Sequence, residues 1–167
     1  MSKREQFGTE NGCDIMRTPK ELFSKLDYIY KFSVDAACSS VNKLCGKGFC
    51  LDLGINGLEV SWRGEYVFCN PPFSKKIDWI KKASNEVMEN GCPLCVMILP
   101  TNSMSSSIWH DAIYGRFNYE ILNGRVQFLD PDEGKATSGN NSGTTLVYFI
   151  KKIGKPSKIV NKGLEVL

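Results

Sequence analysis

Hydrophobic residues recur three or four positions apart in three segments of the chain, as they do on one face of a helix. The first segment predicts a helix over residues 19–30, and Thr18-Pro19-Lys20-Glu21 has the pattern of a capping box with Pro at the first helical position. The second predicts a helix that Ser74 caps and that Asn90-Gly91 ends. The apolar residues of this second helix are Ile77, Ile80, Ala83, Val87 and Met88. The third predicts a short helix ending near Gly115 that contains Ile108, Trp109, Ala112 and Ile113.

Short apolar runs between these segments predict strands at residues 32–37, 48–52, 66–69, 94–99 and 144–150. The run 94–99 is continuous and is stopped by Pro100, as in a central parallel strand. Asn123-Gly124 predicts a hairpin over residues 118–129. The alternation of strands and helices predicts an α/β fold, a single Rossmann-like domain whose sheet is mostly parallel with an antiparallel end.

Length and composition fit one soluble globular domain. The chain has 167 residues, of which 42% are hydrophobic and 23% charged. We expect a domain over residues 17–150, a flexible N-terminus (1–16) and a basic tail (151–167). No run approaches the ~20 apolar residues of a membrane helix, and the N-terminal residues lack the apolar core of a signal peptide. We therefore expect an intracellular, soluble protein of the cytoplasm or nucleoid, or of the nucleus in a eukaryote.

The net charge of +3 does not by itself indicate a nucleic-acid-binding protein. The positive charges are clustered, however, at Lys75, Lys76, Lys81 and Lys82 and at Lys151, Lys152, Lys155 and Lys158. A basic stripe beside a site can neutralise phosphates. A solvated helix face followed by a loose tail is an equally good interpretation.

Seven cysteines, an odd number without secretory context, argue against a disulfide framework. Cys92 and Cys95 have C-x-x-C spacing, but a zinc site needs a second ligand pair, and His110 is the only histidine. Cys95 also lies inside the apolar run 94–99. Buried structural thiols are favoured over a redox pair, and no metal is expected.

Polar residues stand at the carboxyl ends of three of the predicted strands: Asp35, Asn70 and the segment 100–102. Ligands of parallel sheets bind at the carboxyl ends of strands, near the point where the strand order reverses. These residues therefore predict a binding site at one edge of the sheet.

Asn70 opens a stiff corner, Asn70-Pro71-Pro72-Phe73, because two consecutive prolines cannot continue a ladder. The side-chain oxygen of Asn70 and the carbonyl of Pro71 can both accept from a planar NH2 group, while Phe73 offers a face for stacking. The nitrogen lone pair then stays free to attack an electrophile. A turn that only terminates the strand is the alternative.

This corner resembles the Asn/Asp-Pro-Pro-Tyr/Phe motif of amino-methyltransferases that use S-adenosylmethionine. The wider chain resembles the phage-type DNA adenine-N6 methyltransferases in one collinear order over residues 17–150. The matching segments are 17–26, 32–45, 57–83, 96–100, 107–113 and 123–128. The resemblance implies a Rossmann-like methyltransferase fold, S-adenosylmethionine as cofactor and DNA as partner, with adenine as the target.

The resemblance also implies roles for individual residues. Asn70, Pro71, Pro72 and Phe73 would hold a flipped-out adenine. Asp35 would pair with the ammonium group of the cofactor and Asp52 with its ribose. The full set of cofactor residues would be Arg17, Thr18, Pro19, Asp35, Ala36, Cys38, Ser39, Asn42, Asp52 and Asn70. The substrate contacts would be Lys75, Lys76, Asn102 and His110. The segment 35–39 lacks the Gly-x-Gly loop of the wider superfamily.

Other functions remain open at this stage. The same corner serves RNA adenine, cytosine N4 and protein glutamine acceptors, all of which present a planar NH2 group. A catalytically silent nucleic-acid-binding subunit is a second alternative. We expect no separate target-recognition domain, and therefore a sequence specificity that is short or loose, or that a homodimer or a partner subunit supplies.

Overall fold

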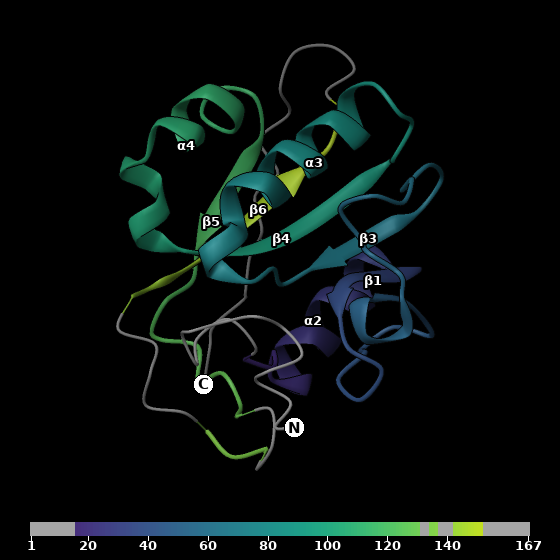
Figure 1. Ribbon diagram of the computed structural model, residues 1–167. Helices are drawn as coiled ribbons and strands as arrows, with labels where there is room; N and C mark the ends of the chain where they lie inside the picture. Colours follow the sequence, from purple (N-terminus) through teal and green to yellow (C-terminus); the bar gives the residue numbers. More distant parts are fainter. Residues whose placement is uncertain (1–15, 131–133, 137–141, 152–167) are drawn as a thin grey trace.

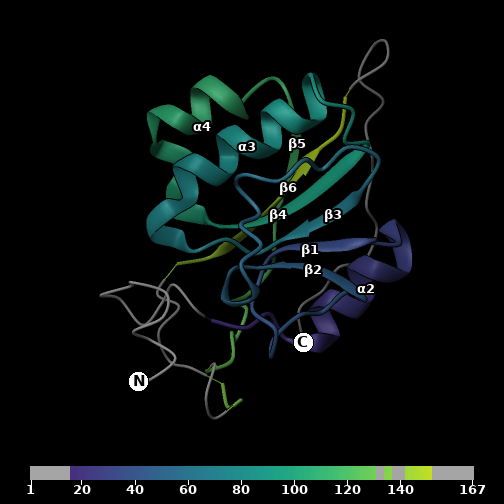
Figure 2. The same ribbon diagram turned by 45° about the vertical axis from the view of Figure 1, so that its right-hand side comes forward.

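The structure is a computed structural model that describes residues 16–130, 134–136 and 142–151. A six-stranded sheet lies between α3 (Lys76–Met88) and α4 (Ser107–Ala112) on one face and α2 (Lys20–Tyr30) on the other (Figures 1 and 2). In chain order the strands are β1 (Val34–Cys38), β2 (Lys47–Cys50), β3 (Tyr66–Cys69), β4 (Leu94–Pro100), β5 (Asn118–Ile121) and β6 (Thr144–Phe149). The described helices do not combine the length and apolar composition that crossing a membrane requires.

The strand order is β2-β1-β3-β4-β6-β5. The first four strands of this order are parallel, and β6 pairs antiparallel with both β4 and β5. The predicted α/β fold, a mostly parallel sheet with an antiparallel end, is therefore confirmed. The strand order reverses between β1 and β3, which places the predicted ligand site at their carboxyl ends.

Alternate residues of β4 enter two separate cores, because successive side chains of a strand point to opposite faces. Cys95, Met97 and Leu99 pack with α3 and α4, whereas Val96 and Ile98 pack with α2. All seven residues of β4 are buried, which confirms the predicted central strand.

Two predicted helix caps are wrong. The N-cap of α2 is Pro19, and no side chain caps this helix; the Thr18 hydroxyl instead accepts a hydrogen bond from Asn70. α3 begins at Lys76 after a short 3-10 turn, η3 (Phe73–Lys75), so Ser74 lies in that turn and does not cap the helix. On α3, Ile80, Ala83 and Val87 are buried as predicted, but Ile77 and Met88 are exposed.

The predicted hairpin at Asn123-Gly124 is also wrong. β5 pairs with β6 and not with the residues that follow it. The chain after β5 turns toward α2, where Leu122, Val126 and Phe128 are buried in the second core. An isolated two-stranded hairpin is marginal in water, so burial of these three side chains decides the conformation.

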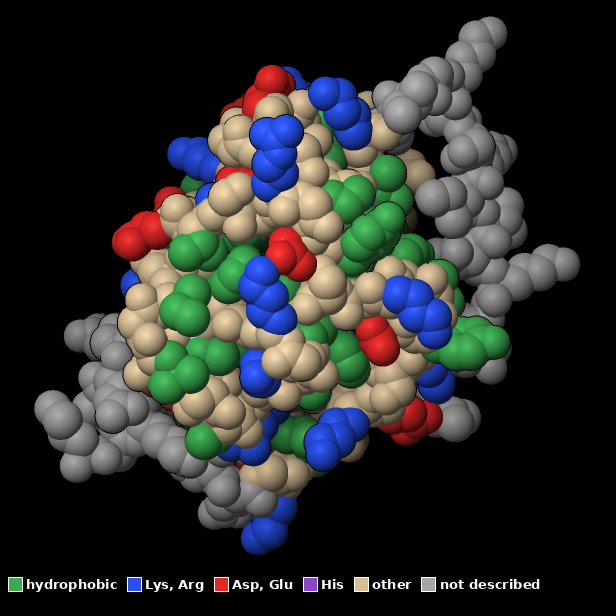
Figure 3. Space-filling model, turned by 90° about the vertical axis from the view of Figure 1, so that its right-hand side faces the viewer, with side chains coloured by type: hydrophobic (Ala, Val, Ile, Leu, Met, Phe, Trp, Pro, Cys, Tyr) green, Lys and Arg blue, Asp and Glu red, His purple; other side chains and the backbone are tan. Residues whose placement is uncertain are grey.

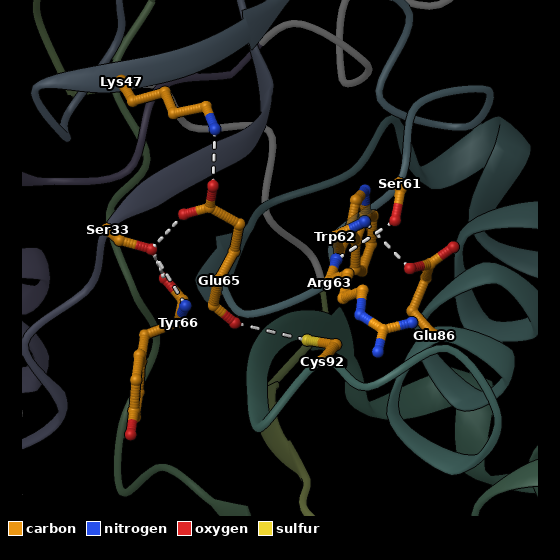
Figure 4. Close-up of polar contacts among 9 residues, drawn as sticks. All are labelled: Ser33, Lys47, Ser61, Trp62, Arg63, Glu65, Tyr66, Glu86 and Cys92. Atoms are coloured by element: carbon orange, nitrogen blue, oxygen red, sulfur yellow. Dashed lines mark hydrogen bonds and ion pairs between the residues drawn. The ribbon is translucent and has the colours of Figure 1, made fainter.

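Glu65 holds together the amino ends of the parallel strands, on the side opposite the predicted site (Figure 4). Its carboxylate accepts from the Ser33 hydroxyl, just before β1, and pairs with Lys47, the first residue of β2. Its carbonyl accepts from the Cys92 thiol before β4. The surface on this side mixes hydrophobic, basic and acidic side chains (Figure 3).

Residues 54–65 form turns, and buried Glu86 of α3 fixes them in place. The Glu86 carboxylate accepts from the backbone N–H of Trp62 at 2.8 Å, from the Lys82 ammonium at 2.7 Å and from the Asn90 side-chain amide at 3.1 Å. Burial alone raises the pKa of Glu86, but these hydrogen bonds outweigh it and the net pKa is lowered. Trp62 stacks on Trp79 with ring centroids 6.3 Å apart, and both tryptophans are buried in the core beneath α3.

Glu86→Ala is expected to lower the free energy of unfolding by about 3 kcal/mol, because it leaves a mostly buried Lys82 ammonium and the Trp62 N–H unpaired. Urea denaturation at pH 7 measures this change. Glu89→Ala, on the exposed residue after the same helix, is the control and should change stability by less than about 0.5 kcal/mol. Equal effects of the two substitutions would contradict the assignment.

Candidate active site

Asn70 directly follows β3, and its amide orientation is fixed by its partners. Its side-chain nitrogen donates to the Met16 carbonyl at 3.2 Å and to the Thr18 hydroxyl at 3.1 Å. A carbonyl oxygen can only accept, so the NH2 group of Asn70 must face Met16. The side-chain oxygen of Asn70 therefore points away from these two residues and can act as an acceptor.

Phe73 completes the corner two prolines later. Its ring is half-buried and meets the Phe128 ring edge-on, with centroids 6.2 Å apart and an interplanar angle of 86°. Pro71 is buried and Pro72 half-buried. Phe128 belongs to the core beneath α2, so this core holds the Phe73 ring in place. Part of the Phe73 ring stays accessible.

Arg17 and Leu129 join the segment before α2 to the segment after Phe128. Each backbone N–H donates to the carbonyl of the other at 2.9 Å, as in an antiparallel bridge. The segments that carry Thr18 and Phe128 therefore approach Asn70-Pro71-Pro72-Phe73 as a connected unit.

Asp35 is the last residue of β1 that pairs with β3, and it is only 3% exposed. Burial raises the pKa of its carboxyl group from 3.8 to about 6, although backbone N–H groups of Leu44 and Ala37 bond it and oppose the rise. Among the described residues no Lys or Arg forms an ion pair with it. A buried carboxylate without a cationic partner suits a ligand that carries an ammonium group.

The loop between β1 and β2 is folded by the polar side chains predicted to bind a cofactor. Asn42 accepts from the Ser39 N–H at 2.6 Å. Asp52 accepts from both the backbone N–H and the hydroxyl of Ser40, the latter at 2.6 Å. Asp52 belongs to the 3-10 turn η2 (Leu51–Leu53), and not to the strand predicted for residues 48–52. The structure thus brings Asp35, Ser39, Asn42 and Asp52 together around one loop.

Ala36 and Cys38 can offer a ligand little beyond their backbone. The Ala36 side chain is fully buried in the core beneath α3. The Cys38 sulfur lies 3.0 Å from that of Cys50 on the adjacent strand, and burial raises the pKa of the Cys38 thiol. Pro19 serves as the N-cap of α2, and its carbonyl accepts from Phe23.

The predicted substrate residues are spread over several elements. Lys75 is exposed, and Lys76 is half-buried at the start of α3. Asn102 is exposed in the 3-10 turn η4 (Thr101–Ser105) after β4, where its N–H donates to Ser142. His110 is exposed on α4 and packs against Tyr114, with ring centroids 5.5 Å apart. Lys75, Lys76 and Asn102 thus follow the carboxyl ends of β3 and β4, while His110 lies further along the chain on a helix.

Two contributors to the corner were absent from the sequence predictions. The Met16 carbonyl orients Asn70, and no side-chain pattern signals the role of a backbone carbonyl. Phe128 packs on Phe73, whereas the Asn123-Gly124 signal predicts a hairpin for this segment.

Cys92 and Cys95 are buried, as predicted for structural thiols. Burial raises the pKa of Cys92 to about 12 and that of Cys95 well above its ordinary value. Reactive thiols have lowered pKa values, so this pair has the opposite character to a redox site.

Residues 8–164 match the protein family described as DNA N-6-adenine-methyltransferase (Dam). The chain belongs to this family. The predicted resemblance to DNA adenine-N6 methyltransferases is thereby confirmed. The match extends beyond the predicted domain of residues 17–150, whose boundaries stay a prediction because residues 1–15 and 152–167 lie outside the described part of the structure.

Two phage proteins named DNA N-6-adenine-methyltransferase are similar to this chain. The protein of Escherichia phage T1 is 30% identical over an alignment of 164 residues, and the match covers 87% of this chain and 66% of that relative. The protein of Haemophilus phage HP1 is 29% identical over an alignment of 144 residues, and the match covers 83% of this chain and 80% of that relative. The chain thus spans just under two thirds of the phage T1 protein.

Asp35→Asn is expected to stabilise the protein relative to wild type increasingly as the pH rises from about 4 to above 6. Between these pH values the folded wild type keeps a proton on Asp35 that the unfolded chain releases, so the free energy of unfolding of the wild type falls as the pH rises. A folded-state pKa of about 6 against 3.8 in the unfolded chain lowers this free energy by about 3 kcal/mol at pH 8. Urea denaturation of both proteins at pH 4.5 and pH 8 measures the difference. A difference that does not change with pH would refute the raised pKa.

Proposed function

We propose that this protein transfers a methyl group from S-adenosylmethionine to the N6 amino group of an adenine in DNA. The observation that carries the proposal is the orientation of the Asn70 amide, whose nitrogen is held by Met16 and Thr18 and whose oxygen is left as an acceptor. An acceptor at this position suits an amino group, and membership of the family supports adenine in DNA as the substrate.

The residues around β1 fit the cofactor by their chemistry. Asp35, buried and without a basic partner among the described residues, would hold the ammonium group. The loop that Asn42 and Asp52 shape would enclose the nucleoside part, with Ser39 at its start. Arg17, Thr18 and Pro19 precede α2 and approach the carboxyl end of β3, where Asn70 bonds the Thr18 hydroxyl. The chemistry that the bound cofactor supplies is an electrophilic methyl group on a sulfonium.

The corner Asn70-Pro71-Pro72-Phe73 would position the base. An adenine inside a duplex presents its amino group to its pairing partner, so it must be flipped out to reach the corner. The oxygen of Asn70 and the carbonyl of Pro71 accept from the two amino hydrogens, and Phe73 stacks on the ring. These bonds strengthen as positive charge develops on the nitrogen, and the remaining contribution is orientation. The proton then leaves to solvent.

Lys75, Lys76, Asn102 and His110 are proposed DNA contacts. Lys75 and Lys76 follow the corner after one intervening residue, so they lie close in sequence to the residues that would hold the flipped base. Their ammonium groups would pair with phosphates. Lys82 is excluded from this role because its ammonium bonds Glu86. Lys152, Lys155 and Lys158 of the predicted basic tail lie outside the described residues. A homodimer or a partner subunit stays a proposal for the source of sequence specificity.

Asn70→Ala is expected to lower methyl transfer at least about 100-fold, because the acceptor for the amino group is lost, with little change in folding. The measurement is transfer of labelled methyl to adenine-containing DNA, with RNA and a peptide alongside, followed by nucleoside mass spectrometry. Asn85→Ala, on the exposed side of α3, is the matched control and should retain full activity. Full activity of Asn70→Ala would refute the role of Asn70 as the acceptor for the amino group. Methylation of RNA but not of DNA would favour RNA adenine as the substrate. Cofactor binding without transfer to any substrate would favour a catalytically silent subunit.

Cofactor affinity is expected to fall about tenfold for each pH unit below about 6, since protonation removes the Asp35 charge that pairs with the ammonium group. Calorimetric titration with S-adenosylmethionine between pH 5 and 8 measures this dependence. Asp35→Asn should bind weakly at every pH. A wild-type affinity that is constant over this range would argue against Asp35 as the ammonium partner.

A further inference from the structure

Thr18 stands where a helix cap is expected but does not cap α2. The helix has Pro19 as its N-cap and no side-chain cap, and Thr18 is 4% exposed. Its hydroxyl instead lies 3.1 Å from the Asn70 amide nitrogen. A buried hydroxyl diverted from the adjacent helix end to a site residue calls for an explanation other than helix stability.

We propose that Thr18 is a positioning residue for methyl transfer, which fixes the Asn70 amide with its oxygen toward the acceptor amino group. This inference rests on the proposed function. It assigns the Thr18 hydroxyl to the substrate side of the site, in place of the cofactor contact that the family resemblance implies.

The two orientations of an Asn amide differ little in shape but are opposite in chemistry. If the Asn70 amide flipped, its NH2 group would face the hydrogens of the acceptor amine, and its oxygen would meet the Met16 carbonyl. Met16 supplies an acceptor for one hydrogen of the Asn70 nitrogen, and Thr18 supplies an acceptor for the other. With both hydrogens bound, the amide plane cannot rotate without breaking a hydrogen bond.

The position of Thr18 does not depend on Asn70. On its amino side, Arg17 is bonded in both directions to Leu129. On its other side, α2 is packed into the core through Leu22, Phe23 and Leu26. Thr18 is therefore held from both neighbours, as a positioning residue must be, and its substitution should leave the fold intact.

Thr18→Val, of nearly the same shape, is expected to lower kcat about tenfold at saturating DNA and cofactor, the size of one lost hydrogen bond in the transition state. The Kd for S-adenosylmethionine should change by less than about threefold, and Thr18→Ser should keep kcat within about threefold of wild type. Ser33→Ala, which removes a hydroxyl hydrogen bond to Glu65 at the amino ends of the strands, opposite the site, is the control and should leave kcat unchanged. An unchanged kcat in Thr18→Val would overturn the inference. So would a loss that excess cofactor restores.

A second measurement does not need turnover. The side-chain NH2 signals of Asn70 can be assigned in nitrogen-15 spectra by their absence in Asn70→Ala. We expect their hydrogens to exchange slowly with water in wild type and Thr18→Ser, and faster in Thr18→Val. Exchange in wild type as fast as that of exposed Asn85 would overturn the inference. The proposed function fails separately, if wild type transfers no methyl group to DNA.

Discussion

The amide of Asn70 is bonded to a segment that lies more than fifty residues earlier in the chain. Its partners, Met16 and Thr18, are placed by α2, and α2 is placed by burying Leu22, Phe23 and Leu26 against the sheet. Nondirectional hydrophobic contacts thus set the position of a directional polar group. The rest of the site depends on the same packing, because Phe128, which supports Phe73, belongs to the core that α2 covers.

The elements with strong periodicity could be predicted from sequence. β3, β4, β6 and α2 lie within one residue of the predicted ends, since their side chains are buried where the pattern requires. Local turn and cap signals were less reliable. Asn123-Gly124 has the residues of a tight hairpin, but burial of Leu122 and Phe128 against α2 outweighs that preference, and Thr18 bonds across the fold instead of along its own helix.

The site could be predicted in part for the same reasons. Asn70 follows a buried strand, and Asp35 is the last residue of β1 that pairs with β3. Both could therefore be predicted from their positions at strand ends. The use of Asp52 to fold the loop could not be foreseen, because it depends on a three-dimensional approach of residues 40 and 52, whereas Asn42 bonds Ser39 only three residues away. The polar groups that the sequence assigns to a ligand here also maintain the shape of the loop that would receive it.

The place of β6 has a consequence for the order of folding during synthesis. This strand, residues 144–149, lies between β4 and β5, and β5 has no other strand partner in the described sheet. As the chain leaves the ribosome, β1 to β4 can pair among themselves, but one edge of β4 stays open until β6 has emerged. An open apolar edge is prone to pair with other chains. Pairing of β6 therefore covers this edge of β4 and ends a period in which the nascent chain is exposed to misassembly.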